Sequence, residues 1–333
     1  MSAVRIGILS TAHVHTAAYA AIASEADDVE FVGVADDDAD RGRTFAEEHD
    51  AEFRKTDELL ASTDGAIVCS ENTAHSEWVE RAAAADVDVL CEKPLATTVD
   101  DAVGIRDVCL DASVHIGVAM PLRFSEPARR AKKQLENGRI GSLRLLAGTN
   151  RGQRPGSWFA DPAKSGGGAA MDHTVHIVDL VRWLTGERVA EVYAQHDTRF
   201  EPLGVEDVNV LSMELTDGSA FTLDGSWSRP DEWDFWGDAT LELVGTKGSI
   251  DVDCFDQTFK LTRDGGPKPG IASVYWGSDP NVGLIRDFVD AVGTDRRPEI
   301  SPDDAVDAVA VVEAAYESAE SGDPVSVSYP TSG

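Results

Sequence analysis

Short apolar runs separated by helical patterns occupy the first 120 residues of the chain. The runs are VRIGIL, EFVGVA, DGAIVCS, VDVLCE and VHIGVA, at residues 4–9, 30–35, 64–70, 87–92 and 114–119. The segments between them have a helical pattern, as at residues 14–23 and from Asp37 onward. Continuous apolar strands that alternate with helices are typical of a parallel sheet covered on both faces. The pattern predicts an α/β, doubly wound domain whose ligands bind at the carboxyl ends of the strands.

Beyond residue 120 the pattern changes to alternation of apolar and polar positions. LRLLAGTN comes first, and VNVLSMEL, SAFTLDGSW, ATLELVG and GSIDVD follow from residues 208, 219, 239 and 248. Asp217-Gly218 and Lys247-Gly248 are turn signals between such runs, and helices are expected at 127–137, 168–184, 282–292 and 302–321. A period of two residues predicts an antiparallel sheet with one solvated face. We therefore expect a first domain at 1–120 and an α+β domain with a large open, mostly antiparallel sheet at 121–333.

The excess of carboxylates indicates which partners the protein can bind and in which salt concentration it is stable. Sixty acidic residues face 29 basic ones, of which only 8 are lysines, and the formal net charge is −31. The acids are spread along the chain, so they do not form a disordered tail. A charge of this sign excludes nucleic acid as a partner, because phosphate binding needs positive charge. Concentrated salt would screen the self-repulsion, so the composition indicates a halophilic protein.

The sequence leads us to expect neither an export signal nor a membrane-spanning segment. No apolar stretch reaches 18 residues, and the start MSAVRIGILS lacks the basic and long apolar regions of a signal peptide. The four cysteines have neither disulfide-framework nor metal-ligand spacing, and we interpret them as buried thiols. A cytoplasmic protein is expected.

The segment after the first strand departs from the dinucleotide fingerprint G-x-G-x-x-G. Its three glycine positions would be Ser10, Ala12 and His15. The context still suits a dinucleotide, because a strand leads through a turn into a helix whose N–H groups can face a pyrophosphate. On this basis the expected cofactor contacts in the turn are Ser10, Thr11, Ala12, His13 and His15.

Asp36 closes the second strand, 21 residues after His15. An acid at this point would accept hydrogen bonds from the adenosine ribose. The alternative is an ordinary solvated acid, since Asp37 and Asp38 follow directly. Because clustered carboxylates repel a 2′-phosphate, we expect NAD as the cofactor, with NADP as the other possibility.

Several longer motifs occur in a fixed order. They are NTAH at 72–75, CEKP at 91–94, LRFSEP at 122–127, NGRIG at 137–141, SGGGAAMDHTVHIVD at 165–179 and LVGTKG at 243–248. Together they resemble the glucose–fructose oxidoreductase and inositol dehydrogenase (Gfo/Idh/MocA) family over nearly the whole chain. The resemblance implies a Rossmann domain followed by a substrate-binding and oligomerisation domain.

The resemblance also implies roles for single residues. Lys93 would touch the substrate and the nicotinamide ribose, His176 would be the acid/base, and Asp172 would bind substrate or orient its neighbours. Asp172, His176 and Asp179 are spaced i, i+4 and i+7, hence on one face of a helix. A helix cap and a core histidine are the alternative for Asp172 and His176. Further contacts are expected to the cofactor from Ser70, Asn72, His75 and Glu92, and to the substrate from Arg123 and Trp158.

The H-x-H of His13 and His15 also raises a metal interpretation. In amidohydrolase barrels such a pair follows the first strand and binds a metal. The second half of this chain alternates as antiparallel strands, so it cannot continue a barrel of β-α units. We accordingly assign no metal.

The function that follows is hydride transfer between a nicotinamide cofactor and a sugar, polyol or inositol-like alcohol. No nucleic acid or membrane partner is expected. The resemblance implies a homo-oligomer, a dimer or a tetramer, in which another subunit covers the open sheet. Two alternatives stay open. One is a non-catalytic dinucleotide- or sugar-binding regulator of the same fold, and the other is an oxidoreductase with a tightly held cofactor.

Overall fold

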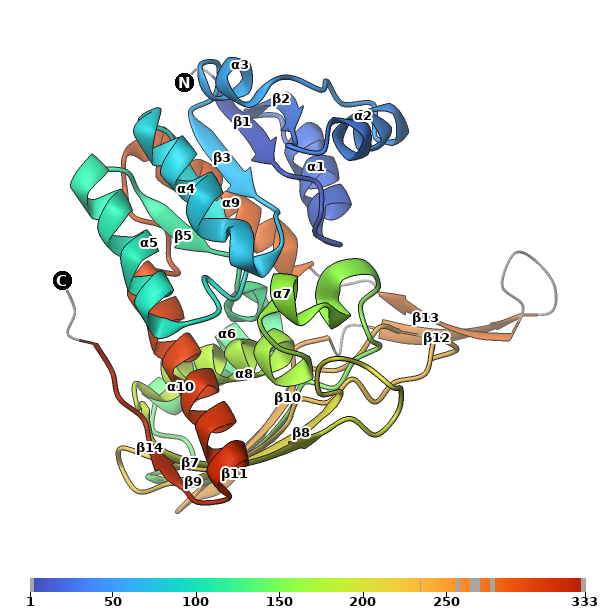
Figure 1. Cartoon of the computed structure of the whole chain (residues 1–333). Helices are drawn as coiled ribbons and strands as arrows, with labels where there is room; N and C mark the ends of the chain where they lie inside the picture. The colour runs from blue at the N-terminus through green and yellow to red at the C-terminus, as the bar shows by residue number, and fades with distance from the viewer. Residues whose placement is uncertain (1–2, 234, 256–257, 264–269, 276–278, 331–333) are drawn as a thin grey trace.

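A computed structural model describes residues 3–233, 235–255, 258–263, 270–275 and 279–330. The described chain folds around two large sheets, which lie one above the other in Figure 1. None of the helices in these ranges is long and apolar enough to cross a membrane.

The first sheet has five parallel strands in the order β2-β1-β3-β4-β5. Its strands are β1 (Val4–Leu9), β2 (Val29–Ala35), β3 (Gly65–Val68), β4 (Asp88–Cys91) and β5 (Ile116–Val118). The connecting helices are α1 (Thr16–Glu25), α2 (Ala39–Glu48), α3 (Thr56–Leu60), α4 (His75–Ala84) and α5 (Val99–Ala112). Every residue of β3 is buried, which explains why these strands are continuous apolar runs. The predicted doubly wound domain is confirmed.

Helix α9 (Pro280–Thr294) returns from the second half of the chain to the first sheet. It packs against α1 and β1. A Cβ added at Gly65 in β3 would meet Val292 and Phe288 of α9 at 2.9 and 3.0 Å. A segment beyond residue 120 therefore covers part of the Rossmann sheet.

The second sheet has seven strands in the order β11-β10-β6-β9-β8-β7-β14. They are β6 (Leu143–Thr149), β7 (Val189–Asp197), β8 (Val208–Leu215), β9 (Ala220–Asp224), β10 (Thr240–Gly245), β11 (Gly248–Asp253) and β14 (Val325–Ser326). Only β6 and β9 pair in parallel, so the prediction of a mostly antiparallel sheet is confirmed. A separate hairpin joins β12 (Thr258–Arg263) to β13 (Gly270–Tyr275).

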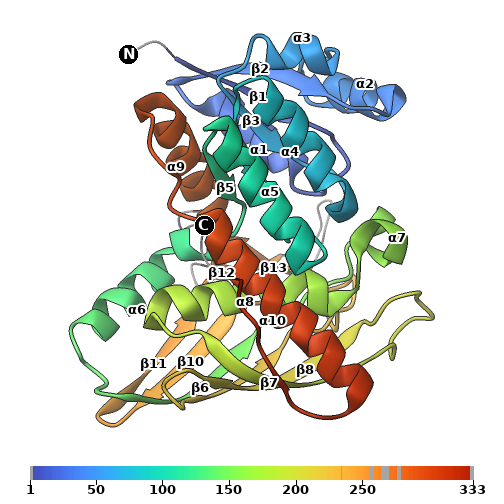
Figure 2. The same cartoon turned by 60° about the vertical axis from the view of Figure 1, so that its left-hand side comes forward.

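One face of the second sheet carries helices and links it to the first domain (Figure 2). They are α6 (Glu126–Glu136), α8 (Ala169–Thr185) and α10 (Pro302–Ser321), with the short α7 (Pro162–Ser165) before α8. Helix α10 packs on α8, on β7 and on α5 of the first domain. Alternate residues of β8 are exposed on the opposite face, as the period-two pattern requires. Helix α8, buried over most of its length, begins beside the first domain.

Candidate active site

Lys93 and Asp172 join the two domains in a buried ion pair. Lys93 follows β4, and Asp172 lies in the first turn of α8. The Lys93 Nζ and Asp172 Oδ1 atoms are 2.5 Å apart, and both side chains are less than a tenth exposed. Burial, the largest single effect, would raise the pKa of Asp172, but the charges of Lys93 and His173 and the hydrogen bonds from Lys93 and Trp227 together lower this pKa. The Asp172 carboxylate is therefore ionised near pH 7, buried against the Lys93 side chain.

Two further side chains fix the Asp172 carboxylate. The Trp227 Nε1–H donates to Asp172 Oδ2 at 3.0 Å. His173 Nε2 lies 3.3 Å from the same oxygen, while His173 Nδ1 lies 3.1 Å from the Gly225 carbonyl oxygen. Neither His173 nor Trp227 was assigned a role from the sequence. Trp227 is distant in the chain, and no motif points to it.

His176 lies one helical turn beyond Asp172 and is buried. Its Nδ1 has no hydrogen-bond partner among the described residues. Burial, and then the positive charge of Lys93, lower the pKa of His176 well below its ordinary value. The imidazole is therefore neutral near pH 7, which is the state that can accept a proton.

The glycines before α8 are packed closely against neighbouring groups of the protein. A Cβ at Gly168 would lie 2.0 Å from the Glu206 carbonyl oxygen, and one at Gly167 would lie 2.1 Å from Tyr316 Oη. The Glu206 carboxylate accepts hydrogen bonds from the Gly168 and Ala170 N–H groups. Tyr316 also donates to Glu206 at 2.8 Å. Glu206, which the sequence did not single out, thus caps α8 and positions Asp172 and His176.

Most backbone N–H groups of the turn after β1 donate hydrogen bonds to acceptors within the protein. Thr11 N–H donates to Asp36 Oδ2 at 2.6 Å, Ala12 N–H to Ser10 Oγ at 3.4 Å and His13 N–H to the Cys69 carbonyl at 3.0 Å. Helix α1 begins at Thr16, two residues later than predicted. The N–H groups of Thr11, Ala12 and His13 therefore already have acceptors within the protein. Ser10 keeps one feature of a glycine, a φ of 64°.

Asp36 is buried at the end of β2 rather than solvated. Arg41 donates to it through Nε at 2.9 Å and Nη2 at 2.8 Å, and Thr11 Oγ1 donates at 2.8 Å. Burial would raise the pKa of Asp36, but the bonds from Arg41 and Thr11 lower it below its usual value. Arg41 is another residue that the sequence analysis missed. Asp36 is the point at which the turn, β2 and α2 are held together.

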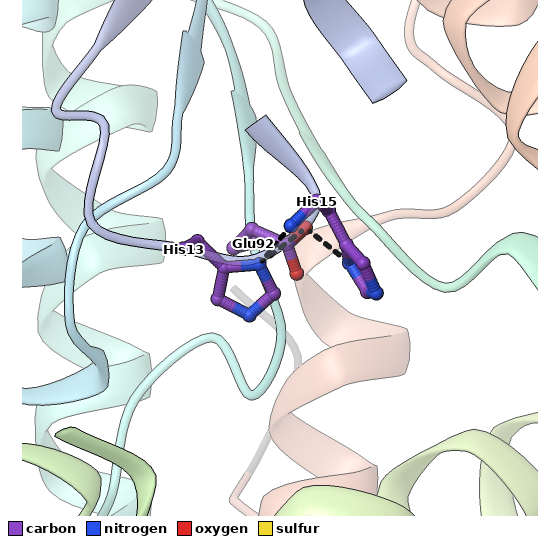
Figure 3. A group of neighbouring side chains, drawn as sticks. All are labelled: His13, His15 and Glu92. Atoms are coloured by element: carbon purple, nitrogen blue, oxygen red, sulfur yellow. Dashed lines mark hydrogen bonds and ion pairs between the residues drawn. The ribbon is translucent and has the colours of Figure 1, made fainter. Parts of the chain in front are cut away.

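His13, His15 and Glu92 form a cluster beside Lys93 (Figure 3). His15 Nδ1 lies 2.8 Å from Glu92 Oε1, and Glu92 Oε2 accepts the Lys93 N–H at 3.0 Å. His13 is wholly buried, and burial lowers its pKa to about 3. Two of the predicted turn residues are therefore linked to the strand end that carries Lys93.

The residues after β3 position other parts of the site. Asn72 donates to the Ser165 carbonyl at 2.8 Å, just before the glycines. His75 Nδ1 lies 2.9 Å from the Pro94 carbonyl oxygen, so it supports the turn that carries Lys93. Ser70 donates to the Glu71 carbonyl at 3.1 Å. In this structure the polar side-chain atoms that contact backbone carbonyl oxygens, and so hold the backbone in place, are those of Ser70, Asn72 and His75.

Trp158 packs against the turn after β1. Its Nε1–H donates to the Ala12 carbonyl at 3.0 Å, and its ring stacks on Phe159 at 4.0 Å between centroids. The His13 ring lies 5.9 Å from that of Trp158. Trp158 therefore ties the segment before α8 to the turn after β1.

Arg123 is paired with two carboxylates, those of Asp179 and Asp304. It donates through Nε to Asp179 Oδ2 at 2.8 Å and lies 3.1 Å from Asp304 Oδ1. Burial raises the pKa of Asp179 to about 6, against the lowering effect of Arg123. The contacts assign Arg123 to a buried ion network, whereas the sequence predicted a substrate contact.

Replacing Arg123 with alanine is expected to destabilise the fold. Removing one partner of a buried ion pair leaves its carboxylates uncompensated, which costs about 3–5 kcal/mol. Urea unfolding in molar KCl measures the loss. Arg130→Ala is the matched control, because Arg130 pairs with Glu126 on the surface, and its loss should be far smaller. Equal stability of Arg123→Ala and Arg130→Ala would contradict this assignment.

Comparisons with known proteins agree with this architecture. Residues 4–120 match the model of an oxidoreductase family with an NAD-binding Rossmann fold, and residues 128–251 match the GFO/IDH/MocA C-terminal domain. A myo-inositol 2-dehydrogenase of Thermotoga maritima is 27% identical, with 95% of this chain and 96% of the relative covered. The inositol 2-dehydrogenase of Rhizobium meliloti is 26% identical, with the same coverage.

A solved structure is similar over almost the full length. GenD2 from gentamicin A biosynthesis, in complex with NAD, superposes with a TM-score of 0.89 at 25% identity, covering 98% of this chain and 97% of that one. With both family models matched in consecutive order, the chain belongs to the Gfo/Idh/MocA family of NAD-binding oxidoreductases.

Proposed function

We propose that this protein is an NAD-dependent dehydrogenase that acts on a CH–OH group of a sugar, polyol or inositol-like alcohol. The observation that carries the proposal is the buried Lys93–Asp172 pair beside a neutral His176 whose Nδ1 is unpartnered within the described chain. Groups of this kind are those that alcohol oxidation needs, an electrophile and a base. The names of the inositol dehydrogenases among its relatives support the substrate class.

NAD, when bound, supplies the hydride acceptor. The remaining tasks fall to side chains of this protein. The Lys93 side chain stabilises the developing charge on the substrate oxygen, and Asp172 holds that side chain in place. The imidazole of His176 accepts the hydroxyl proton in oxidation and returns it in reduction. Trp227 and Glu206 hold Asp172 and the start of α8, so they are positioning residues.

The residues at the carboxyl edge of the first sheet fit this cofactor. Ser10 has the positive φ that glycine supplies in the fingerprint turn, and Asp36 stands buried at the end of β2. Because the Thr11, Ala12 and His13 N–H groups are used internally, side chains must carry more of the binding than in a glycine-rich turn. We assign this side-chain contribution to cofactor binding to Ser10, Thr11 and His15.

Replacing Asp36 with serine is expected to narrow the preference for NAD over NADP. The change removes the carboxylate that repels a 2′-phosphate, and it frees the Arg41 guanidinium to meet that phosphate. Fluorescence titration with NADH and NADPH in one high-salt buffer measures the ratio of the two dissociation constants. Asp37→Ser is the control, because Asp37 is more exposed and pairs with Arg81. Tighter binding of NADPH by the unmodified protein would contradict the placement of the ribose.

Nicotinamide absorbance, followed with a panel of sugars and polyols, tests the activity. Reduction of NAD by at least one cyclic polyol or aldose is expected. A regulator of the same fold would bind dinucleotide or sugar without turnover, and the internally bonded turn is the observation in its favour. A tightly held cofactor would appear as nicotinamide absorbance in the purified protein.

The setting and assembly of the enzyme are part of the proposal. The dispersed carboxylates support a halophilic, cytoplasmic enzyme. The open face of the seven-stranded sheet exposes Leu145 and Val210, at 41% and 50%. Apolar side chains on an uncovered sheet face support assembly into a homo-oligomer.

A further inference from the structure

Three side chains of metal-binding types converge where the turn after β1 meets the end of β4 (Figure 3). The potential ligand atoms of His13, His15 and Glu92 all lie within 4.8 Å of one another. Glu92 Oε1 is 2.8 Å from His15 Nδ1 and 3.4 Å from His13 Nδ1. The side chains of His13 and Glu92 are fully buried, and that of His15 is one-third exposed.

His13 Nδ1 and Glu92 Oε1 are in contact without a hydrogen bond between them. His13 Nδ1 accepts the backbone N–H of His15 at 3.2 Å, so this nitrogen carries a lone pair. A carboxylate oxygen is also only an acceptor. Two lone pairs therefore face each other at 3.4 Å in a site without solvent, where such repulsion is poorly screened. A cation between the two atoms would turn this repulsion into attraction.

The charge balance around Glu92 points the same way. The neighbouring Lys93 side chain is already paired with Asp172 at 2.5 Å, and Lys93 meets Glu92 through its backbone N–H. A cation held between His13 Nδ1 and Glu92 Oε1 would therefore balance the Glu92 carboxylate without disturbing the Lys93–Asp172 pair.

We propose that His13, His15 and Glu92 bind a divalent transition-metal ion, with zinc as the expected occupant. A His₂Glu set with nitrogen and oxygen donors suits zinc, and it leaves one coordination position open. Metal–ligand bonds of about 2.0–2.2 Å place tetrahedral ligand atoms about 3.3 Å apart, close to the distances from Glu92 Oε1. The ion would replace the long His15 N–H contact on His13 Nδ1 and would fasten the turn to β4, next to Lys93.

This proposal does not depend on the dehydrogenase activity. The sequence argument against a metal concerned the barrel fold with which H-x-H is associated. The convergence of both histidines with Glu92 is a separate fact, because Glu92 lies 77 positions from His15. The chemistry assigned to Lys93 and His176 does not use the metal. His15 is also a proposed cofactor contact, but metal content is measured without NAD, so failure of the metal proposal and failure of the dehydrogenase proposal are distinguishable.

The test measures metal in untagged protein without substrate or NAD. Protein stripped by a chelator is dialysed in molar KCl against a small excess of zinc, and bound metal is measured by mass spectrometry. About one zinc per chain is expected. Cobalt is the second probe, because a tetrahedral nitrogen–oxygen site gives Co²⁺ a strong visible absorption. A large rise in thermal midpoint on adding zinc is also expected, since the ion binds the folded state.

His15→Gln is the principal variant, because glutamine keeps an N–H donor for Glu92 but is a poor zinc ligand. Losing a ligand should weaken zinc binding by at least the roughly 10–100-fold that losing an outer-shell partner costs. Glu92→Gln should do the same, and circular dichroism establishes that each variant is folded. His49→Ala removes a histidine exposed on the surface and should leave the zinc content unchanged. Less than a tenth of an equivalent in the unmodified protein, or unchanged binding in folded His15→Gln, would overturn the proposal.

Discussion

Replacing His176 with alanine is expected to lower kcat for alcohol oxidation by roughly 10²-fold or more, the usual contribution of a positioned acid/base. The imidazole is buried, neutral and unpartnered at Nδ1 within the described residues, so alanine removes the group proposed to take the proton. Binding of NAD should change far less, because His176 lies on α8 in the second domain. Steady-state kinetics and NADH titration separate the two effects.

Lys93→Ala should lower kcat to a similar extent, because it removes the charge proposed to act on the same substrate oxygen. The double variant should lose less than the product of the single losses, since groups that act as a unit are non-additive. His49→Ala on the surface is the control and should keep full activity. Full activity in His176→Ala would contradict the mechanism, and loss of NAD binding in both single variants would instead favour a structural or cofactor role.

The value of kcat is expected to fall at low pH, where His176 becomes protonated. Because the pKa of His176 is lowered, the base stays unprotonated below the ordinary histidine value of about 6.5. We expect the acid limb of the kcat profile to lie below that value and to vanish in His176→Ala.

Molar KCl is expected to raise the thermal midpoint of this protein strongly compared with low salt. At a net charge of −31, mutual repulsion of carboxylates destabilises the compact state. A Debye length of about 3 Å at 1 M, against about 30 Å at 0.01 M, screens this repulsion. Differential scanning calorimetry over a KCl series gives the midpoint at each ionic strength.

A control separates screening from general solute exclusion. Sucrose at matched osmolality stabilises proteins without adding ions, so it should raise the midpoint less than KCl does. A midpoint that is flat or falls with KCl would remove the halophilic interpretation. The dehydrogenase proposal would be unaffected by that result.

The sheets and main helices could be predicted because their signals are local. Parallel strands buried on both faces must be apolar, and β8 and β11 match their predicted bounds because alternation is strict there. Helix α10 also matches, since Ser301 and Asp304 form a capping box and Gly322 ends the helix. Strand β7 was missed because a register shift between Val189 and Glu191 breaks its period of two.

The site was predictable only as far as the family motifs extend. These motifs brought out Lys93, Asp172 and His176, although 79 positions separate Lys93 from Asp172. Glu206 and Arg41 act through contacts made by the fold, and one sequence gives no signal for such partners. The replaced glycines indicated that the turn after β1 is unusual, but the acceptors that satisfy its N–H groups depend on tertiary structure.

The most direct test of the central claim is NADH formation in molar KCl, measured in parallel on unmodified protein and on Lys93→Ala. The panel contains inositols, aldoses and linear polyols, and calorimetry records NAD binding in the same buffer. We predict absorbance of reduced nicotinamide with at least one cyclic polyol or aldose, lowered by roughly 10²-fold or more in Lys93→Ala. Absence of both NAD binding and NADH formation, or equal turnover by the two proteins, would contradict the account.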